Sequence, residues 1–332
     1  MQILDSALDI TTLMTDIARF PIDRHSIPQH KLDLDNRGRT SLFPWRGQFS
    51  PELIELLLKE FAEAQSVVLD PFVGSGTVLF EATRKSLSCF GVEINPAAVE
   101  MARTAHFANI ELAQRNEYLS KAQSIVDEHI SSYFNYPLFA PLEREKKSHR
   151  SLRDAFQDMV HEALSSPLVH NIIANTIIHY MGLRDEEGPE AFWRAFNRHK
   201  VIIQELPYNS NPCKVFHRDA RDIPLDGESI DLIITSPPYI NVFNYHQQYR
   251  EAMELMGWNL LRVAKSEFGS NRKNRGNRFL TVVQYAVDML QALGEMRRLI
   301  APDGRIIIVI GRESNVRGVS FQNGQILAAL AV

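Results

Sequence analysis

The sequence predicts an α/β fold in which a doubly wound, mostly parallel sheet carries a helical insertion. Two apolar runs, 67–70 and 88–94, flank a glycine-rich turn and a helix, which is the order of a βαβ unit. A third apolar run, 230–234, has the continuous hydrophobicity of a strand that is buried on both faces. Between these regions, residues 110–205 show mostly helical spacing and form a stretch too long for a connecting loop.

The elements follow in chain order. Residues 1–40 form an N-terminal extension, in which a helix is expected near Leu4–Phe20. Apolar spacing over 51–64 predicts a helix that leads into the first strand. The remaining elements predicted outside the insertion are a helix from Val78 to Arg84, a strand over 88–94, a helix from Ala97 to about Asn109, a strand near 216, the strand over 230–234, a helix over 281–300, a strand over 305–311 and a helix over 325–332.

The first strand leads into the loop Asp70-Pro71-Phe72-Val73-Gly74-Ser75-Gly76-Thr77. Glycines let a backbone pass close to a ligand, and the helix that follows presents free N–H groups. No Gly-Lys-Ser/Thr follows, and the third glycine of the dinucleotide fingerprint is missing. Glu93 lies about 20 residues after the turn, where a carboxylate can accept hydrogen bonds from ribose hydroxyls. We therefore predict a nucleoside site, with incidental glycines in a βαβ unit as the alternative.

A second motif, Ser236-Pro237-Pro238-Tyr239, follows the apolar run 230–234. It therefore lies at the carboxyl end of a strand, where open α/β sheets bind ligands. The prolines stiffen the turn and leave their carbonyl oxygens as acceptors. A hydroxyl, a fixed carbonyl and an aromatic face could hold a planar base by its amino group. By itself the motif is also compatible with a proline turn that ends a strand.

Together, Asp-Pro-Phe-Val-Gly-Ser-Gly-Thr and Thr-Ser-Pro-Pro-Tyr resemble the S-adenosylmethionine-dependent amino-methyltransferases of DNA, which methylate N4 of cytosine or N6 of adenine. The resemblance covers residues 43–100 and 215–312. It implies the Rossmann-like class I methyltransferase fold, S-adenosylmethionine as the cofactor and double-stranded DNA as the partner. The expected domains are a catalytic domain made of 41–109 and 206–312, a helical target-recognition candidate at 110–205, and a C-terminal segment at 313–332 that could be truncated.

The resemblance also assigns roles to residues. The Ser236 hydroxyl and the Pro237 carbonyl would accept hydrogen bonds from the exocyclic amine, beside Pro238 in the same turn. Tyr239 would stack on a base flipped out of the duplex. Transfer would be one in-line displacement without a covalent intermediate or a metal. The residues expected to bind the cofactor are Phe43, Trp45, Asp70, Phe72, Gly74, Ser75, Gly76, Thr77, Glu93, Asn95, Asp219 and Ala220. Asp219 would contact the adenine or merely cap a turn, and Trp45 is also compatible with ordinary core.

Several alternatives remain at this point. Ser236 favours cytosine N4, because related enzymes acting on adenine N6 usually carry Asp or Asn there. An RNA or protein-glutamine methyltransferase and a non-catalytic DNA-binding relative are further alternatives. Pro212-Cys213 resembles the nucleophile of cytosine C5 methyltransferases, but it precedes the third strand, so we expect an ordinary loop cysteine. The enzyme would modify a defined DNA sequence, either with a cognate restriction endonuclease or as a solitary enzyme.

Composition supports a soluble, cytoplasmic enzyme. The chain has 332 residues, 45% of them hydrophobic, and only two cysteines, which fits a reducing compartment. No run of 18 apolar residues predicts a membrane span. The net charge of −4 means that any DNA contact depends on local basic segments. The expected phosphate contacts are Arg272, Lys273 and Arg275 in a loop after the catalytic strand, with a solvated surface loop as the alternative. Lys146 and Lys147 lie in a basic stretch of the insertion that is expected to bind DNA in target recognition, with a lid or a partner surface as the alternative.

The C-terminal part is the least regular. The related fold normally ends with an antiparallel hairpin strand, and nothing after Phe321 resembles it. Either the chain is truncated or another element takes the edge of the sheet, because an uncovered edge would favour aggregation.

Overall fold

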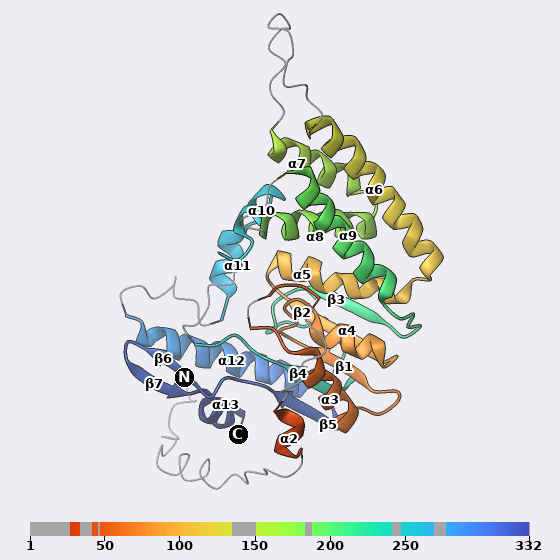
Figure 1. Cartoon of the computed structure of the whole chain (residues 1–332). Helices are drawn as coiled ribbons and strands as arrows, with labels where there is room; N and C mark the ends of the chain where they lie inside the picture. Colours follow the sequence, from red (N-terminus) through yellow and green to blue (C-terminus); the bar gives the residue numbers. More distant parts are fainter. Residues whose placement is uncertain are drawn as a thin grey trace, which may run out of the picture.

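The computed structural model describes residues 27–33, 42–45, 47–134, 151–182, 188–240, 247–268 and 277–331 (Figure 1). The helix expected near Leu4–Phe20 lies outside these residues. The main sheet has five parallel strands in the order β3-β2-β1-β4-β5, which confirms the predicted α/β fold. The strands are β1 (Val67–Asp70), β2 (Ser88–Glu93), β3 (Cys213–His217), β4 (Ile230–Thr235) and β5 (Ile300–Ile308).

Both faces of this sheet are covered. Along β1, Val68 packs with one group of helices and Leu69 with the other, since successive side chains of a strand point to opposite faces. The first face is covered by α3 (Pro51–Phe61), α4 (Thr77–Arg84), α5 (Pro96–Arg103) and the 3-10 turn η1 (Thr104–Asn109). The second face is covered by α12 (Phe279–Leu299). The continuous apolar runs of the sequence therefore reflect a sheet buried on both sides.

Local signals set the helix starts on the first face. Ser50 caps α3 by accepting a hydrogen bond from the Leu53 amide at 3.2 Å, and Pro51 occupies the first turn. Asn95 caps α5 in the same way, accepting from the amides of Ala97 and Ala98. Both helices thus begin just where a strand or loop reaches the edge of the cavity described below.

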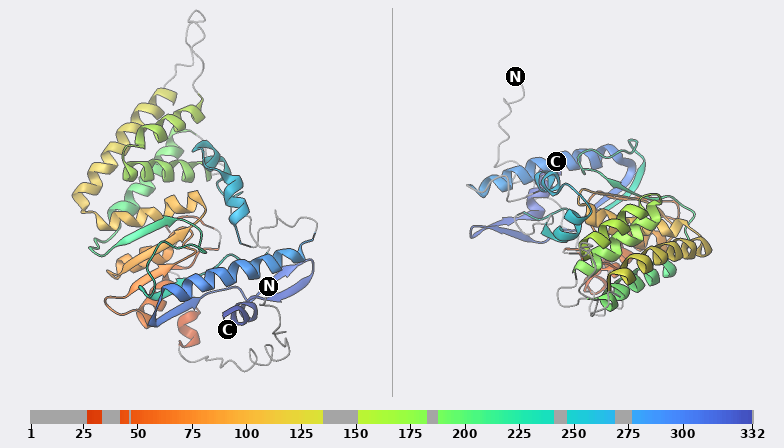
Figure 2. Two further views of the ribbon diagram at one scale, coloured as in Figure 1. Left: turned by 180° about the vertical axis from the view of Figure 1, so that it is seen from behind. Right: turned by 90° about the horizontal axis from the view of Figure 1, so that it is seen from above.

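Helices form most of the described part of residues 110–205, as predicted. They are α6 (Leu112–Phe134), α7 (Leu152–Ala163), α8 (Pro167–Gly182) and α9 (Pro189–Glu205). They gather at one end of the molecule, and the sheet with α12 lies at the other (Figures 1 and 2). The side-chain amides of Asn171 and Asn175 on α8 donate hydrogen bonds to the backbone carbonyl of Glu100 on α5, at 2.7 and 2.9 Å. These helices share one apolar core with the first face of the sheet, so the insertion is packed onto it rather than tethered.

The C-terminal part contains the helix predicted over 325–332, together with a hairpin that was not predicted. The hairpin is formed by β6 (Glu313–Val316) and β7 (Val319–Gln322), but it precedes α13 (Asn323–Ala331) and forms its own two-stranded sheet. Its turn has left-handed backbone at Arg317 and Gly318. Among the described residues β3 and β5 are the two edge strands of the main sheet.

Three short helices complete the described chain: α2 (Gln29–Leu32), α10 (Arg250–Leu255) and α11 (Leu260–Ser266). No helix in the described part of the chain is both long and apolar enough to cross a membrane.

Candidate functional site

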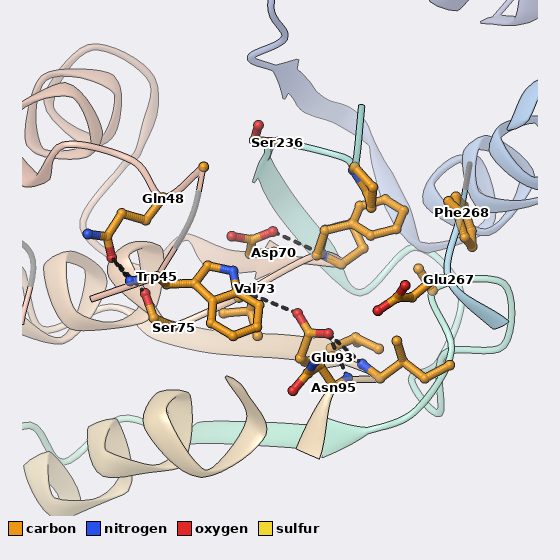
Figure 3. A pocket seen from close by; sticks show the side chains of 18 of the residues that line it. Trp45, Gln48, Asp70, Val73, Ser75, Glu93, Asn95, Ser236, Glu267 and Phe268 are labelled. Carbon is orange, nitrogen blue, oxygen red and sulfur yellow. Dashed lines mark hydrogen bonds between the residues drawn. The ribbon is translucent and has the colours of Figure 1, made fainter. Parts of the chain in front are cut away.

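A cavity opens at the carboxyl ends of β1, β2 and β4. Its floor is the loop after β1, and its far wall is formed by Ser266, Glu267 and Phe268 at the end of α11. Figure 3 shows Asp70, Glu93 and Glu267 around this cavity, with Ser236 at its edge. Both predicted motifs therefore meet at the position where open α/β sheets bind ligands.

Two glycines shape the floor. Gly74 has φ +51°, and a Cβ atom there would lie 3.1 Å from Trp45 Nε1. Gly76 has φ +97°, and a Cβ atom there would lie 2.9 Å from the Cα atom of Ala102 on α5. Because L residues rarely adopt such φ values and neither position has free space, both require glycine. Gly74 lines the cavity, whereas Gly76 lies behind it and sets the approach of α4 to α5.

Asp70 ties β1 to β4. Its Oδ1 accepts hydrogen bonds from the Thr235 hydroxyl at 2.6 Å and from the Phe72 amide at 3.0 Å. The side chain is 1% exposed, and burial raises the pKa of Asp70 from 3.8 to about 7, although both hydrogen bonds favour the charged form. Thr235 directly precedes Ser236, so this bond also fixes the start of the second motif.

Glu93 holds the glycine loop. Its carboxylate accepts hydrogen bonds from the amides of Gly74 at 3.0 Å, Ile94 at 2.9 Å and Asn95 at 2.8 Å. Burial nevertheless raises the pKa of Glu93 to about 7, and the nearby Glu267 carboxylate raises it further. A carboxylate in this condition is poised to be stabilised by a ligand that brings positive charge or hydroxyl donors.

The segment before α3 forms the opposite wall. Gln48 Oε1 accepts from the Ser75 hydroxyl at 3.1 Å and from the Trp45 amide at 3.3 Å, which links this wall to the floor. The Trp45 ring stacks on Tyr249 with centroids 6.4 Å apart, and the Tyr249 hydroxyl donates to the Pro44 carbonyl at 2.5 Å.

Phe43, which precedes this wall, is 2% exposed and stacks on His199 at 5.3 Å. The structure therefore brings Trp45 to the cavity, while Phe43 belongs to the core beneath it.

The second motif reaches the cavity through Ser236 and Pro238. The Ser236 hydroxyl lies 3.5 Å from the Tyr239 hydroxyl, and either oxygen can be the donor. Pro237 is buried, and the Tyr239 ring packs near Gly311, where a Cβ atom would lie 3.5 Å from the ring. Ser236 thus presents a polar oxygen at the edge of the cavity formed by Asp70 and Glu93.

A sequence model of the N6/N4 DNA methylase family, described as DNA methylase, matches residues 25–104. The type II methyltransferase M.MjaII of Methanocaldococcus jannaschii is 19% identical over 397 aligned residues, which cover 86% of this chain and 74% of that protein. The chain is therefore similar to the N6/N4 DNA methylases over residues 25–104, and distantly similar to a type II methyltransferase over most of its length. The resemblance predicted from the two motifs is confirmed, and the matched segment includes the glycine loop and Glu93.

S-adenosylmethionine is the cofactor that this family implies, and the cavity fits it. The carboxyl groups of Asp70, Glu93, Asp219 and Glu267 line the cavity, and Arg218 is the one cation among the described lining residues. S-adenosylmethionine carries a sulfonium and an ammonium group against one carboxylate, so its net charge is positive. An acidic cavity with two carboxyl groups of raised pKa suits such a ligand.

Most residues predicted to bind the cofactor line this cavity. Asn95 does so while its side-chain oxygen caps α5, so its role in the cavity is shared with a structural one. Of the predicted set, only Phe43 and Gly76 do not line it. The residues that do are Trp45, Asp70, Phe72, Gly74, Ser75, Thr77, Glu93, Asn95, Asp219 and Ala220.

Sequence reasoning missed an arginine that holds Asp219. Arg221 donates to both Asp219 oxygens, from Nε at 2.8 Å and from a terminal nitrogen at 2.6 Å, and to Asp288 on α12 at 2.5 Å. Its guanidinium also lies 4.9 Å from the Phe268 ring centre. Asp219 is therefore held by the Arg221 side chain, and its Oδ1 also caps the turn by accepting a hydrogen bond from the Arg221 amide at 3.0 Å, as the turn-capping alternative predicted.

The Glu267-Phe268 pair was missed as well. Phe268 packs edge-on against Phe72 with centroids 5.2 Å apart, so the loop after β1 and the end of α11 close one side of the cavity. Asp-Ala-Arg at 219–221 was a readable signal for the arginine, because short-range ion pairs can be inferred from spacing. No comparable spacing in the sequence indicates that Glu267 and Phe268 belong to the cavity.

Cys213 is a strand residue and not the loop cysteine that was expected. It begins β3 and lies opposite Cys89 of β2, and both thiols are buried. The contact with Cys213 and burial both raise the pKa of the Cys89 thiol. Neither cysteine is near the cavity, so the pair packs as apolar core.

The predicted DNA contacts Arg272, Lys273, Arg275, Lys146 and Lys147 lie outside the described residues. They stay predictions from the sequence.

Proposed function

We propose that this chain transfers the methyl group of S-adenosylmethionine to an exocyclic amine of a base in duplex DNA, with cytosine N4 as the preferred atom. One observation carries the proposal. Ser236 lies at the edge of the same cavity that Asp70 and Glu93 form on the neighbouring strands, so an amine held by Ser236 would face a cofactor held by the loop.

The cofactor side follows from the described residues. Bound S-adenosylmethionine supplies an electrophilic methyl group on a sulfonium. Glu93, which already orders the amide of Gly74, would accept hydrogen bonds from the ribose hydroxyls. The backbone around Gly74 and Ser75 would hold the methionine part, because Gly74 lines the cavity and has no side chain of its own. Asp219, held by Arg221, would face the adenine.

The base side depends on Ser236. An exocyclic amine is a poor nucleophile because its lone pair is delocalised into the ring. The Ser236 hydroxyl and the Pro237 carbonyl would accept hydrogen bonds from the N–H₂ group and so turn nitrogen electron density toward the methyl group. The neighbouring Thr235 does not share this role, because it is buried, donates its hydroxyl to Asp70 at 2.6 Å and does not line the cavity. The base must leave the duplex to reach this point, and Tyr239 would stack on it.

Serine at position 236 supports cytosine N4 over adenine N6, as in the related enzymes that carry Ser-Pro-Pro-Tyr. The domain assignment is part of the proposal. Residues 41–109 and 206–312 would form the catalytic domain, and the helices within 110–205 would recognise the target. The likeness to a type II methyltransferase supports a modification enzyme with a defined recognition sequence and a cognate restriction endonuclease as partner.

The test is methyl transfer from labelled S-adenosylmethionine to unmethylated duplex DNA, with the product nucleosides separated by mass. We expect N4-methylcytosine, and a loss of about 100-fold or more in rate for Ser236→Ala, because a hydrogen-bond acceptor at the reacting amine is removed. Ser229→Ala is the matched control, since Ser229 is exposed on the loop before β4 and donates only to the Asp226 carbonyl. N6-methyladenine would refute the choice of base, and transfer to RNA or protein alone would refute DNA as the substrate.

A further inference from the structure

The outer face of α12 is apolar and exposed. Leu280, Val283, Val287 and Leu290 are between 47% and 59% exposed, and their spacing of three and four residues places them in one stripe. Twelve large apolar side chains are exposed in the described part of the chain, and six of them lie on this face or beside it on the hairpin. The two further members are Phe279 and Val319. A contiguous patch of this kind on a soluble protein marks an interaction surface.

The opposite face of α12 is buried in the core of the chain itself. Tyr285, Met289 and Met296 are fully buried in the core under the sheet, and Leu327 of α13 packs in the same cluster. The exposed stripe is therefore not a displaced core face. Its helix lies along the outside of the molecule, beside the hairpin (Figures 1 and 2).

The stripe is self-complementary, and from this we propose that it joins two copies of this chain in an antiparallel, two-fold symmetric dimer. In an antiparallel pair centred on Tyr285, Leu280 faces Leu290 of the second copy and Val283 faces Val287. Both pairings have the same centre, as an isologous interface requires. The residues occupy alternating a and d positions of a heptad, so an a side chain meets a d side chain in every layer.

Charge is also consistent with a second copy of the chain. The exposed positions from 279 to 294 are Phe279, Leu280, Val283, Val287, Leu290, Gln291 and Gly294, and none of them is charged. A charge near a two-fold axis would meet its own copy, so an uncharged face is what this symmetry needs. The stripe is short, so we expect a dissociation constant of about 10 to 100 μM.

The first experiment is sedimentation equilibrium of the full chain from about 1 to 200 μM. We expect a monomer–dimer equilibrium that Val283→Glu weakens by more than about tenfold, because each interface would bury two added carboxylates. Val201→Glu is the matched control, since Val201 on α9 is 49% exposed and lies off this face. A wild-type chain that stays monomeric, or a dimer that survives Val283→Glu, overturns the proposal.

The second experiment tests the antiparallel register. A mixture of Leu280→Cys and Leu290→Cys chains should form disulfide-linked dimers, while Leu280→Cys alone should not, because its two copies would lie about 15 Å apart along the axis. The native cysteines are buried and do not interfere.

If a segment of the same chain covered the apolar stripe of α12 in place of a second copy, the measurements would give a different result. Residues 1–26 of the same chain also carry apolar residues at helical spacing. If they covered the stripe, Val283→Glu would lower the melting temperature of dilute, monomeric protein, and this result would overturn the dimer. None of these measurements involves methyl transfer, so they test the dimer independently of the proposed function.

Discussion

Replacing Asp70 by Asn should make the cofactor-free protein more stable at neutral and alkaline pH. The Asp70 carboxyl is 1% exposed, and both of its hydrogen-bond donors, from Thr235 and Phe72, bond to the same oxygen, Oδ1. An asparagine could keep both bonds through its carbonyl oxygen and direct its amide into the cavity. The substitution therefore removes a buried charge without removing the bond that joins β1 to β4.

The magnitude follows from the raised pKa. Because the pKa of Asp70 is about 7 in the folded protein and 3.8 when unfolded, the neutral form contributes stability at low pH that is lost as pH rises through 7. The full loss approaches ~4 kcal/mol above pH 7, and ~2.5 kcal/mol of it falls between pH 5 and pH 8. Asparagine does not suffer this loss. The stability difference between variant and wild type should therefore grow by up to that amount between pH 5 and pH 8, or by roughly 5 °C in melting temperature.

Thermal unfolding of both proteins at pH 5 and pH 8, without cofactor, is the assay. Asp231→Asn is the matched control, because Asp231 on β4 is exposed and accepts one backbone hydrogen bond, from Val67 at 2.7 Å. The control should show no growing difference with pH. Equal destabilisation of Asp70→Asn at both pH values would refute the reasoning, since it would mean that the hydrogen bonds and not the buried charge decide the effect.

Three further predictions concern the cofactor and its frame. The affinity for S-adenosylmethionine should increase between pH 5.5 and pH 7.5 by up to about tenfold per pH unit for each of Asp70 and Glu93, because a cation favours their charged forms. Calorimetry would show the accompanying proton release, and a flat profile would contradict it. Gly76→Ala should cost ~2 to 4 kcal/mol in chemical denaturation, while Gly294→Ala, a helical position with open space, should stabilise by ~0.5 to 1 kcal/mol. Arg221→Met should cost ~3 kcal/mol by leaving Asp288 buried without its arginine, and a second change to Asn at position 288 should recover part of that loss if the charge is the cause.

The fold was predictable from the sequence where strands are buried on both faces, because such strands appear as continuous apolar runs. β1, β2 and β4 have this property, and their bounds agree with the sequence to within a residue or two. β5 was harder, because Pro302-Asp303-Gly304 looks like a break. In the structure these residues lie in an irregular stretch between the pairs Ile230↔Ile300 and Leu232↔Arg305, so the strand begins before them.

The hairpin was not predicted from the sequence, for a different reason. Its turn uses Arg317, a non-glycine residue with φ +53°, and its short strands lie outside the main sheet and lack a clear alternation of apolar side chains. The cavity was likewise predicted only in part. Its floor and its acid at position 93 come from one contiguous βαβ unit and were predicted, whereas Glu267 and Phe268 reach it from a helix whose place depends on tertiary packing.

The cavity concentrates acids at a cost to the empty protein. Asp70 and Glu93 both have a pKa near 7 because burial disfavours their charge, and Glu267 opposes the ionisation of Glu93 further. Two backbone features, the glycine loop and the cap of α5, are nevertheless ordered by Glu93 and Asn95. A cationic ligand would remove the electrostatic penalty without changing these bonds. Folding and cofactor binding are therefore linked through the same carboxylates, so the cofactor should stabilise the fold more as the pH rises through 7.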